Sequence, residues 1–190
     1  MKCNEFNIYL DTTNTDFALF LFNEKYEVLD KVIYKDLKKK VDIIPTEFEN
    51  FLKKNNLKIE LIKGLYTNIG PGFFTGVRAG FVFLRTLSLL NEIDFYITRT
   101  FDILSKQIKD NKIYLNAQGQ KLYEFDLSKH KKTNDYENSI TIIDCDEKKI
   151  SQINFEDMIN NFSLYKDIFV KVKPLEIEPL YIKKPQIGGL

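Results

Sequence analysis

The stretch from Gly70 to Gly80 has the residue types and spacing most suggestive of chemistry. It reads Gly-Pro-Gly-Phe-Phe-Thr-Gly-Val-Arg-Ala-Gly, between a predicted strand and a predicted helix. A tight turn at Pro71 and the free N–H groups of a helix start together suit an anion. The stretch matches neither a Walker loop nor the dinucleotide fingerprint. A second interpretation stays open, in which Gly76 and Gly80 share one helical face and allow another backbone to approach closely.

A second candidate group is Asp11-Thr12-Thr13, which follows a short apolar run. A carboxylate and two hydroxyls at a turn could face a magnesium–phosphate group, but the same residue types also form ordinary turns. His130, the only histidine, lies in a basic stretch that we expect to be a solvated loop, and the two cysteines, Cys3 and Cys145, are far apart in the sequence. One histidine and two isolated thiols do not make a zinc centre, so a metalloprotease fails on ligand count.

Length and composition predict one compact domain or two small lobes, because the chain has 190 residues, of which 44% are hydrophobic and 29% charged. The 28 basic and 27 acidic residues leave a net charge of +1, which gives no whole-chain reason to bind nucleic acid or an anionic membrane. The chain has only two cysteines, which is typical of a reducing compartment. We find no signal-peptide pattern and no apolar run that approaches about 18 residues, so we expect a cytoplasmic protein without a membrane contact.

The elements that must position these residues begin with three short strands. Three apolar runs joined by short turns predict an antiparallel meander over residues 7–10, 17–22 and 28–34. Apolar residues at helical spacing then predict a helix that either spans about Leu37–Asn56 with a kink at Pro45 or begins at Pro45. A strand over Gly64–Ile69 leads into the glycine stretch and a strong helix over Thr75–Leu90.

A polar break at Lys109–Lys112 is the predicted domain boundary. Residues 1–108 then form a first lobe that ends with a strand near 95–98 and a helix near 100–108. Residues 109–190 form a smaller second lobe with a loose C-terminal tail from Lys183. Its predicted elements are strands at 113–116, 122–127, 140–143 and 168–172 and a short helix at 155–162.

The helix over Thr75–Leu90 is apolar around much of its circumference. The apolar residues that show this include Val77, Phe81, Val82, Leu84, Leu87 and Leu90. One sheet covers only one side of a helix, so this helix and the one before it predict a surface for a partner helix pair.

The order of these features resembles the TsaB (YeaZ) family, the non-catalytic, actin-like partner of the tRNA threonylcarbamoyladenosine synthase. Gly70–Gly80 resembles the family's G-P-G-S-F-T-G-[LV]-R-x-G, and Ile8–Thr13 resembles its first strand and turn. Weaker similarities occur at 98–101, 115–123 and 178–182. The positions that match the family motifs are Asp11, Thr12, Thr13, Gly70, Pro71, Gly72, Phe74, Thr75, Gly76, Arg78 and Gly80.

The resemblance implies an α/β, actin-like ATPase or ribonuclease H-like fold of two lobes, each a mixed sheet with flanking helices, the second one reduced. It implies a scaffold with no catalytic residues or metal site of its own. Such a subunit binds and activates a TsaD-like subunit, which with a TsaE-like ATPase transfers threonylcarbamoyl to adenosine 37 of ANN-decoding tRNAs. ATP and magnesium then belong to the partner subunits, no cofactor is tightly bound, and tRNA is met only through the complex.

The family pairs through a helical bundle, which the same helices could also use to pair two copies of this chain. The positions that the resemblance assigns to this bundle are Val41, Ile44, Phe48, Leu52, Val77, Phe81, Leu84 and Arg85. On this hypothesis Phe81→Asp abolishes pairing and leaves the monomer folded.

Three departures from the family move the chain away from nucleotide chemistry. Asn116 stands where many relatives have an acidic residue, Phe73 replaces a common serine, and Lys38–Lys40 occupy a position where relatives often have histidine. The alternative function is a small actin-like phosphotransferase or ATPase, with Asp11 and Thr12 at the metal and the glycine turn near phosphate.

Overall fold

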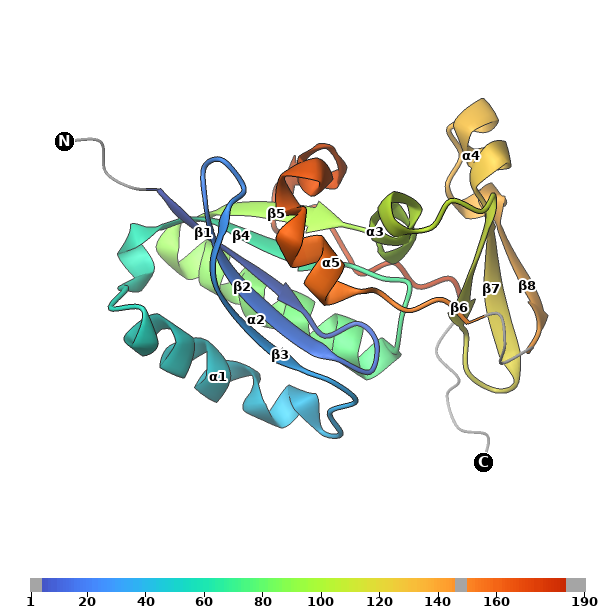
Figure 1. Ribbon diagram of the computed structural model, residues 1–190. Helices are drawn as coiled ribbons and strands as arrows, with labels where there is room; N and C mark the ends of the chain where they lie inside the picture. The colour runs from blue at the N-terminus through green and yellow to red at the C-terminus, as the bar shows by residue number, and fades with distance from the viewer. Residues whose placement is uncertain (1–4, 146–149, 184–190) are drawn as a thin grey trace.

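The structure is a computed structural model that describes residues 5–145 and 150–183. Cys3 lies outside these residues, as does the predicted loose tail from Lys183 except for Lys183 itself, whose ammonium is hydrogen-bonded to the small sheet's hairpin. Within them, the chain forms a six-stranded mixed sheet in the order β3-β2-β1-β4-β5-β9 and a three-stranded sheet in the order β6-β7-β8 (Figure 1).

The large sheet starts with the predicted meander. β1 (Phe6–Asp11), β2 (Phe17–Asn23) and β3 (Val28–Tyr34) pair antiparallel, since their joins are too short for a crossover. β4 (Ile62–Asn68) and β5 (Asp94–Thr98) then add in parallel to β1. These five strands lie in the order β3-β2-β1-β4-β5, and β2 is the strand among them that runs antiparallel to the others. This arrangement is that of the ribonuclease H-like fold, so the predicted fold class is confirmed.

Two hydrophobic cores lie on opposite faces of this sheet, because successive strand residues point to opposite faces. α1 (Lys40–Lys54) and α2 (Phe74–Asn91) cover one face and pack on Ile8 and Leu10. The opposite face carries α3 (Thr100–Gln107), α5 (Phe155–Asn160) and the 3-10 helix η4 (Phe162–Ile168), which pack on Tyr9 and Phe20 (Figure 1).

α1 begins at neither of the two predicted positions. It starts at Lys40 because Lys39 takes a left-handed conformation, with φ of 58°, which interrupts the helix between Leu37 and Val41. Pro45 lies inside the helix. A short 3-10 helix η1 (Ile59–Leu61) then leads into β4.

The small sheet consists of β6 (Lys112–Asn116), β7 (Lys121–Asp126) and β8 (Ile140–Asp144). The predicted solvated loop around His130 is instead helical. It contains α4 (Leu127–Thr133), capped by the Asp126 carboxylate, and the 3-10 helix η2 (Glu137–Ser139), and the imidazole of His130 lies 5.3 Å from the ring of Phe125.

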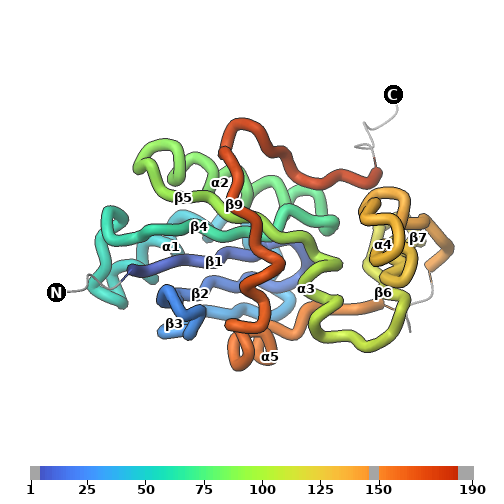
Figure 2. The backbone as a smooth tube through the Cα atoms, turned by 90° about the horizontal axis from the view of Figure 1, so that it is seen from above, coloured from blue at the N-terminus to red at the C-terminus, as the bar shows by residue number. Residues whose placement is uncertain are grey.

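The chain then returns to the large sheet, so sheet membership does not follow the predicted lobes throughout. Figure 2 shows the segment from α5 to β9 (Val170–Val172) crossing the large sheet, and β9 pairs antiparallel with β5. Aromatic residues drive this return, since Phe155, Phe162 and Phe169 pack into the core around Tyr9. Residues 112–144 form the small sheet, whereas residues 155–172 lie with the large one.

In the part of the chain that the structure describes, every helix is too short or too polar to span a lipid bilayer.

Candidate functional site

The turn between β1 and β2 lies directly against the start of α2. The backbone N–H of Phe73 donates to Thr13 O at 2.7 Å, and Thr12 Oγ1 donates to Gly76 O at 2.7 Å. Both threonines are almost fully buried. The two motifs that the sequence singled out, Asp11–Thr13 and the glycine stretch, are therefore one contact in the structure.

Three glycines of the stretch make this contact possible. A Cβ on Gly72 would lie 2.4 Å from Thr13 O, and a Cβ on Gly76 would lie 2.1 Å from Thr12 O. A Cβ on Gly80 would lie 2.4 Å from Thr12 Oγ1. These separations are too short for a real side chain, so the close-packing interpretation of the glycines is confirmed.

The Asp11 carboxylate is fully used inside the protein. Its Oδ1 accepts from Thr13 N at 2.8 Å and from Thr13 Oγ1 at 2.6 Å, and its Oδ2 accepts from Tyr9 OH at 2.7 Å and Asn68 Nδ2 at 3.0 Å. Only 1% of the residue is exposed. Burial, and then the charge of Asp11, raise the pKa of the Tyr9 hydroxyl. Asp11 is thus a buried acceptor that holds the turn.

Asn68, at the end of β4, extends this network to the glycine turn. Its Nδ2 also donates to Thr13 Oγ1 at 3.1 Å and to Thr100 Oγ1 at 3.0 Å, and its Oδ1 accepts from Gly70 N at 2.9 Å. Thr100 Oγ1 in turn donates to Pro71 O at 2.7 Å. Gly70 has a φ of 100°, a conformation that favours glycine.

Our sequence reasoning missed Asn68 and Thr100 as site residues. The available signal was a polar residue at the carboxyl end of an apolar strand and the weak family similarity over residues 98–101. Both side chains are buried and lie where strand ends meet the glycine turn.

Asn116, the predicted departure from an acidic residue, lies at the end of β6. Its Oδ1 accepts from Gln118 N at 2.8 Å. It lines a small cavity of about 120 Å³ together with Phe73 and residues 14–16 of the β1–β2 turn. Across residues 5–145 and 150–183, His, Cys, Asp and Glu side chains form no cluster of three or more that could hold a metal ion.

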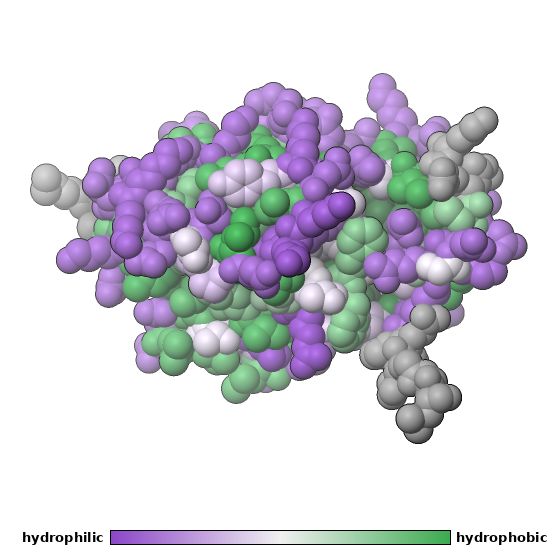
Figure 3. Space-filling view, turned by 90° about the horizontal axis from the view of Figure 1, so that it is seen from below, coloured by the Kyte–Doolittle hydropathy of each residue, from purple (hydrophilic) through white to green (hydrophobic). Residues whose placement is uncertain are grey.

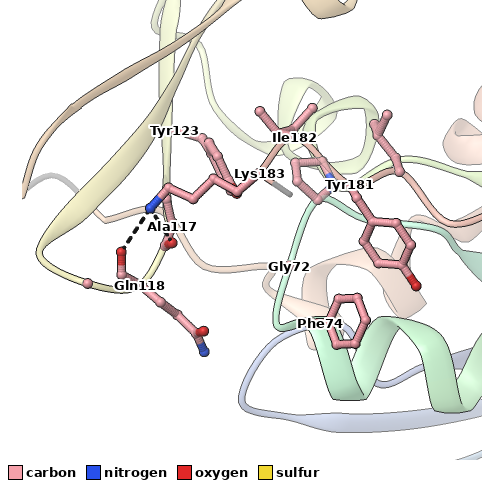
Figure 4. Close-up of a pocket in the computed structure, with 11 residues that line it drawn as sticks. Gly72, Phe74, Ala117, Gln118, Tyr123, Tyr181, Ile182 and Lys183 are labelled. Atoms are coloured by element: carbon pink, nitrogen blue, oxygen red, sulfur yellow. Dashed lines mark hydrogen bonds between the residues drawn. The ribbon is translucent and has the colours of Figure 1, made fainter. Parts of the chain in front are cut away.

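A larger cavity, of about 380 Å³, separates the glycine turn from the hairpin of the small sheet (Figure 4). The rings of Phe74 and Tyr181 lie 4.9 Å apart along one side of it. Lys183 Nζ donates to Ala117 O at 2.9 Å and to Gln118 O at 3.1 Å, as the dashed lines show. The last described residues therefore tie the hairpin of the small sheet to the start of α2.

Most of the predicted partner-binding side chains lie in the protein's own core. Ile44, Phe48, Val77, Phe81 and Leu84 are at most 5% exposed, because α1 and α2 pack on each other and on the large sheet. They cannot contact a partner while this packing persists. The premise of the Phe81→Asp prediction, an accessible ring, is wrong because Phe81 is fully buried, so this substitution should destabilise the monomer itself.

The other three predicted partner positions are half-buried. Leu52 packs against the same core, and Val41 lies in the first turn of α1. The Arg85 guanidinium pairs with Glu178 at 3.1 Å and lies 4.9 Å from the centre of the Phe81 ring.

The side of α2 that faces away from the sheet presents a different set of residues. We call this set the α2 outer face; its members recur at helical spacing and are Arg78, Val82, Thr86, Leu89 and Leu90. Val82 is 38% exposed, Leu89 44% and Leu90 75%. Figure 3 shows the molecule from below, where hydrophobic residues are interspersed with hydrophilic ones.

Comparison with known proteins gives two weak sequence relatives, and no protein-family model matches the chain. An uncharacterized protein of Mycoplasma genitalium, MG208, is 28% identical over 156 residues, which are 72% of this chain and 74% of the relative. Its homolog in Mycoplasma pneumoniae, also uncharacterized, is 26% identical over 89 residues. That alignment spans 46% of this chain and only 45% of the relative's length.

Two solved structures are similar over nearly the whole chain. The crystal structure of an uncharacterized protein described as similar to peptidase YeaZ from Pseudomonas aeruginosa has a TM-score of 0.65 at 11% identity, over 94% of this chain and 100% of that one. YeaZ from Pseudomonas aeruginosa has a TM-score of 0.62 at 12% identity, over 93% and 99%. This chain therefore has the fold of the YeaZ structures, a mixed-sheet α/β fold with a smaller second sheet.

Proposed function

We propose that this chain is a TsaB-like accessory subunit, which binds and activates a TsaD-like catalytic subunit for threonylcarbamoyl transfer to adenosine 37 of ANN-decoding tRNAs. The observation that carries the proposal is the likeness to YeaZ structures over 94% of this chain and 100% of the matched one. The resemblance of Gly70–Gly80 to the family motif supports it independently, because that comparison rests on residues rather than on the backbone.

The state of Asp11 and Thr12 favours a scaffold over the phosphotransferase alternative. A phosphotransferase needs a carboxylate that can reach a magnesium ion, whereas both Asp11 oxygens already accept two hydrogen bonds each inside the protein. The Thr12 hydroxyl is likewise engaged with Gly76 O. These groups hold α2 against the sheet, which is what a subunit that presents a helix requires.

In this proposal the partner packs against the α2 outer face rather than against the buried residues that the sequence suggested. Val82, Leu89 and Leu90 offer apolar area on a helix that is fixed at its first turn. Fully burying an exposed leucine side chain contributes about 1.5–3 kcal/mol, and partly exposed side chains such as Val82 and Leu89 contribute a fraction of this, so several together can anchor a helix pair. The proposal also includes a TsaE-like ATPase as a further partner, with ATP and magnesium bound on the partner subunits. The chain would meet tRNA only through the complex, in the cytoplasm.

The test is co-purification of this chain with the TsaD-like protein of the same genome, followed by a tRNA modification assay with and without this chain. Leu89→Glu should weaken pairing by at least about tenfold, because it removes apolar contact and places a charge in the interface, while the monomer unfolds at an unchanged urea concentration. Leu164→Glu is the matched control, since Leu164 is 65% exposed on η4, across the sheet from α2.

Two outcomes would contradict the proposal. One is a failure of the two proteins to associate, together with magnesium-dependent ATP hydrolysis by this chain that Asp11→Ala abolishes; the phosphotransferase alternative would then apply. The other is pairing that Leu89→Glu and Leu164→Glu reduce equally, which would remove α2 as the docking helix.

A further inference from the structure

α1 and α2 begin beside each other, and neither start has a side-chain cap. Within the described residues, the backbone N–H groups of Phe74, Thr75 and Gly76 in α2 have no hydrogen-bond partner, and the same holds for those of Lys40 and Val41 in α1. Both helices are long, with 15 and 18 residues, so each start carries the positive end of a helix dipole. Two positive helix ends therefore meet in one place.

A buried lysine lies between these two helix starts. Lys40 is only 7% exposed, and its ammonium has no hydrogen bond and no ion pair within the described residues. Its Nζ lies 5.9 Å from the centre of the Phe73 ring, and its Cε approaches Gly76 closely enough that a Cβ there would lie 3.3 Å away. Burial lowers the pKa of Lys40, and the charges of Asp11 and Asp16 oppose this from beyond ion-pair distance.

Lys40 lines a cavity of about 440 Å³ at this junction. Lys38 and Lys39 also line it, and Asp36 is the only carboxylate in the lining. Its apolar wall comes from Leu37, Val41 and Phe73. The cavity thus combines a surplus of positive charge at one side with an apolar surface at the other.

We propose that this cavity binds a small phosphomonoester. Its phosphate would lie against the Lys40 ammonium and the free N–H groups at the starts of α1 and α2, because a buried cation and uncapped helix starts both gain hydrogen bonds from such a group. Its organic part would lie on Leu37, Val41 and Phe73, since the cavity is much larger than a phosphate ion. The site uses neither the α2 outer face nor the Asp11 carboxylate, so it is independent of the proposed partner binding.

The probes are phenyl phosphate, inorganic phosphate and phenol, titrated into the full-length chain by calorimetry. We expect phenyl phosphate to bind, inorganic phosphate to bind more weakly, and phenol not to bind. Lys40→Met should weaken binding of phenyl phosphate by about tenfold or more, as expected for a lost charge-assisted contact. Lys58→Met is the control, because Lys58 is exposed beyond the C-terminal end of α1 and lies outside the cavity lining, and it should change the affinity by less than about threefold.

Thr75→Glu tests the same site without removing the buried lysine. Thr75 is exposed and its hydroxyl has no hydrogen bond within residues 5–145 and 150–183, and a glutamate in the first turn suits the helix dipole, so the fold should be kept. The new carboxylate should compete with phosphate and abolish binding. The proposal is overturned if the unmodified chain does not bind phenyl phosphate, if phenol binds equally well, or if Thr75→Glu and Lys40→Met bind as the unmodified chain does.

Discussion

Adding one methyl group at Gly80 tests the close contact between α2 and the β1–β2 turn. A Cβ at Gly80 would lie 2.4 Å from Thr12 Oγ1, but 3.6 Å from the Cβ of Thr12 and 3.8 Å from its Cγ2. The same hydroxyl donates to Gly76 O at 2.7 Å. Gly80→Ala must therefore displace one hydroxyl and its buried hydrogen bond, and little else.

The expected change in the free energy of unfolding follows from three contributions. Alanine is favoured over glycine inside a helix by about 1 kcal/mol. Losing the Thr12 hydrogen bond costs about 1 kcal/mol, and overpacking a buried site costs about 1–3 kcal/mol. Gly80→Ala should thus destabilise the protein by about 1–3 kcal/mol, although the same change at an open helical position would stabilise it.

Removing the hydroxyl should rescue this variant. In the Thr12→Ala/Gly80→Ala double variant the atom 2.4 Å away is gone, so the helix preference of alanine remains without the clash. We expect the double variant to be more stable than Gly80→Ala by about 1–2 kcal/mol, a positive coupling between two residues in contact.

Gly76→Ala is the matched control on the same helix and against the same threonine. Its Cβ would lie 2.1 Å from Thr12 O, a backbone atom that Thr12→Ala leaves in place. Thr12→Ala should therefore fail to rescue Gly76→Ala.

Urea unfolding followed by circular dichroism measures the unmodified chain, the three single variants and the two double variants, with tyrosine fluorescence as a second probe because the chain has 10 tyrosines and no tryptophan. The reasoning is refuted if Gly80→Ala is as stable as the unmodified chain. It is also refuted if Thr12→Ala rescues Gly76→Ala and Gly80→Ala to the same extent.

Three further predictions concern the core and the buried polar groups. Phe81→Ala should lower the free energy of urea unfolding by about 3–5 kcal/mol, because its ring is fully buried in the core under α2. Asn68→Asp places a second carboxyl next to Asp11, whose Oδ2 lies 3.0 Å from Asn68 Nδ2, and the nearby negative charge should raise the pKa of the new carboxyl. The variant should therefore lose stability as pH rises above about 4 and regain it in acid, whereas Asn68→Ala should show no such pH dependence. Burial raises the pKa of Asp102, although the charges of Arg99 and His130 oppose the shift. The contribution of Asp102 to stability therefore falls as pH rises from about 4 through the folded-state pKa. Asp102→Asn should make the midpoint of urea unfolding less dependent on pH across that range.

The local elements of the large sheet could be predicted from the sequence because their signals are local. The turn after Asp11 is too short for a crossover, so β1 and β2 had to pair antiparallel. The start of α2 was marked by Gly70-Pro71-Gly72, and its length by an apolar pattern that continues to Leu90. The α1 start was missed because nothing in a run of lysines announces that Lys39 takes a left-handed conformation.

The surface of α2 could not be assigned from the sequence, because periodicity does not say which apolar stripe meets the chain's own sheet. Phe81 and Leu84 lie on one side of the helix, and Val82 and Leu89 on the other. Both sides are apolar, so the pattern could not correct the assignment of Phe81 and Leu84 to the partner, and the fold places these two residues inside. The pairing of β9 with β5 is a long-range contact of the same kind, which no local pattern specifies.

The glycine stretch and the α2 outer face are linked through the helix they share. Gly76 lets the first turn of α2 lie on the backbone of the β1–β2 turn, Gly80 leaves room for the Thr12 hydroxyl, and the Asp11 network holds that turn from the other side. A helix fixed in this way loses less conformational freedom when a partner covers its outer face, so more of the contact energy remains for binding. If the proposed function holds, buried residues that never reach a partner should also affect pairing: Gly76→Ala should weaken association with a TsaD-like subunit by shifting α2, although it changes no residue of the outer face.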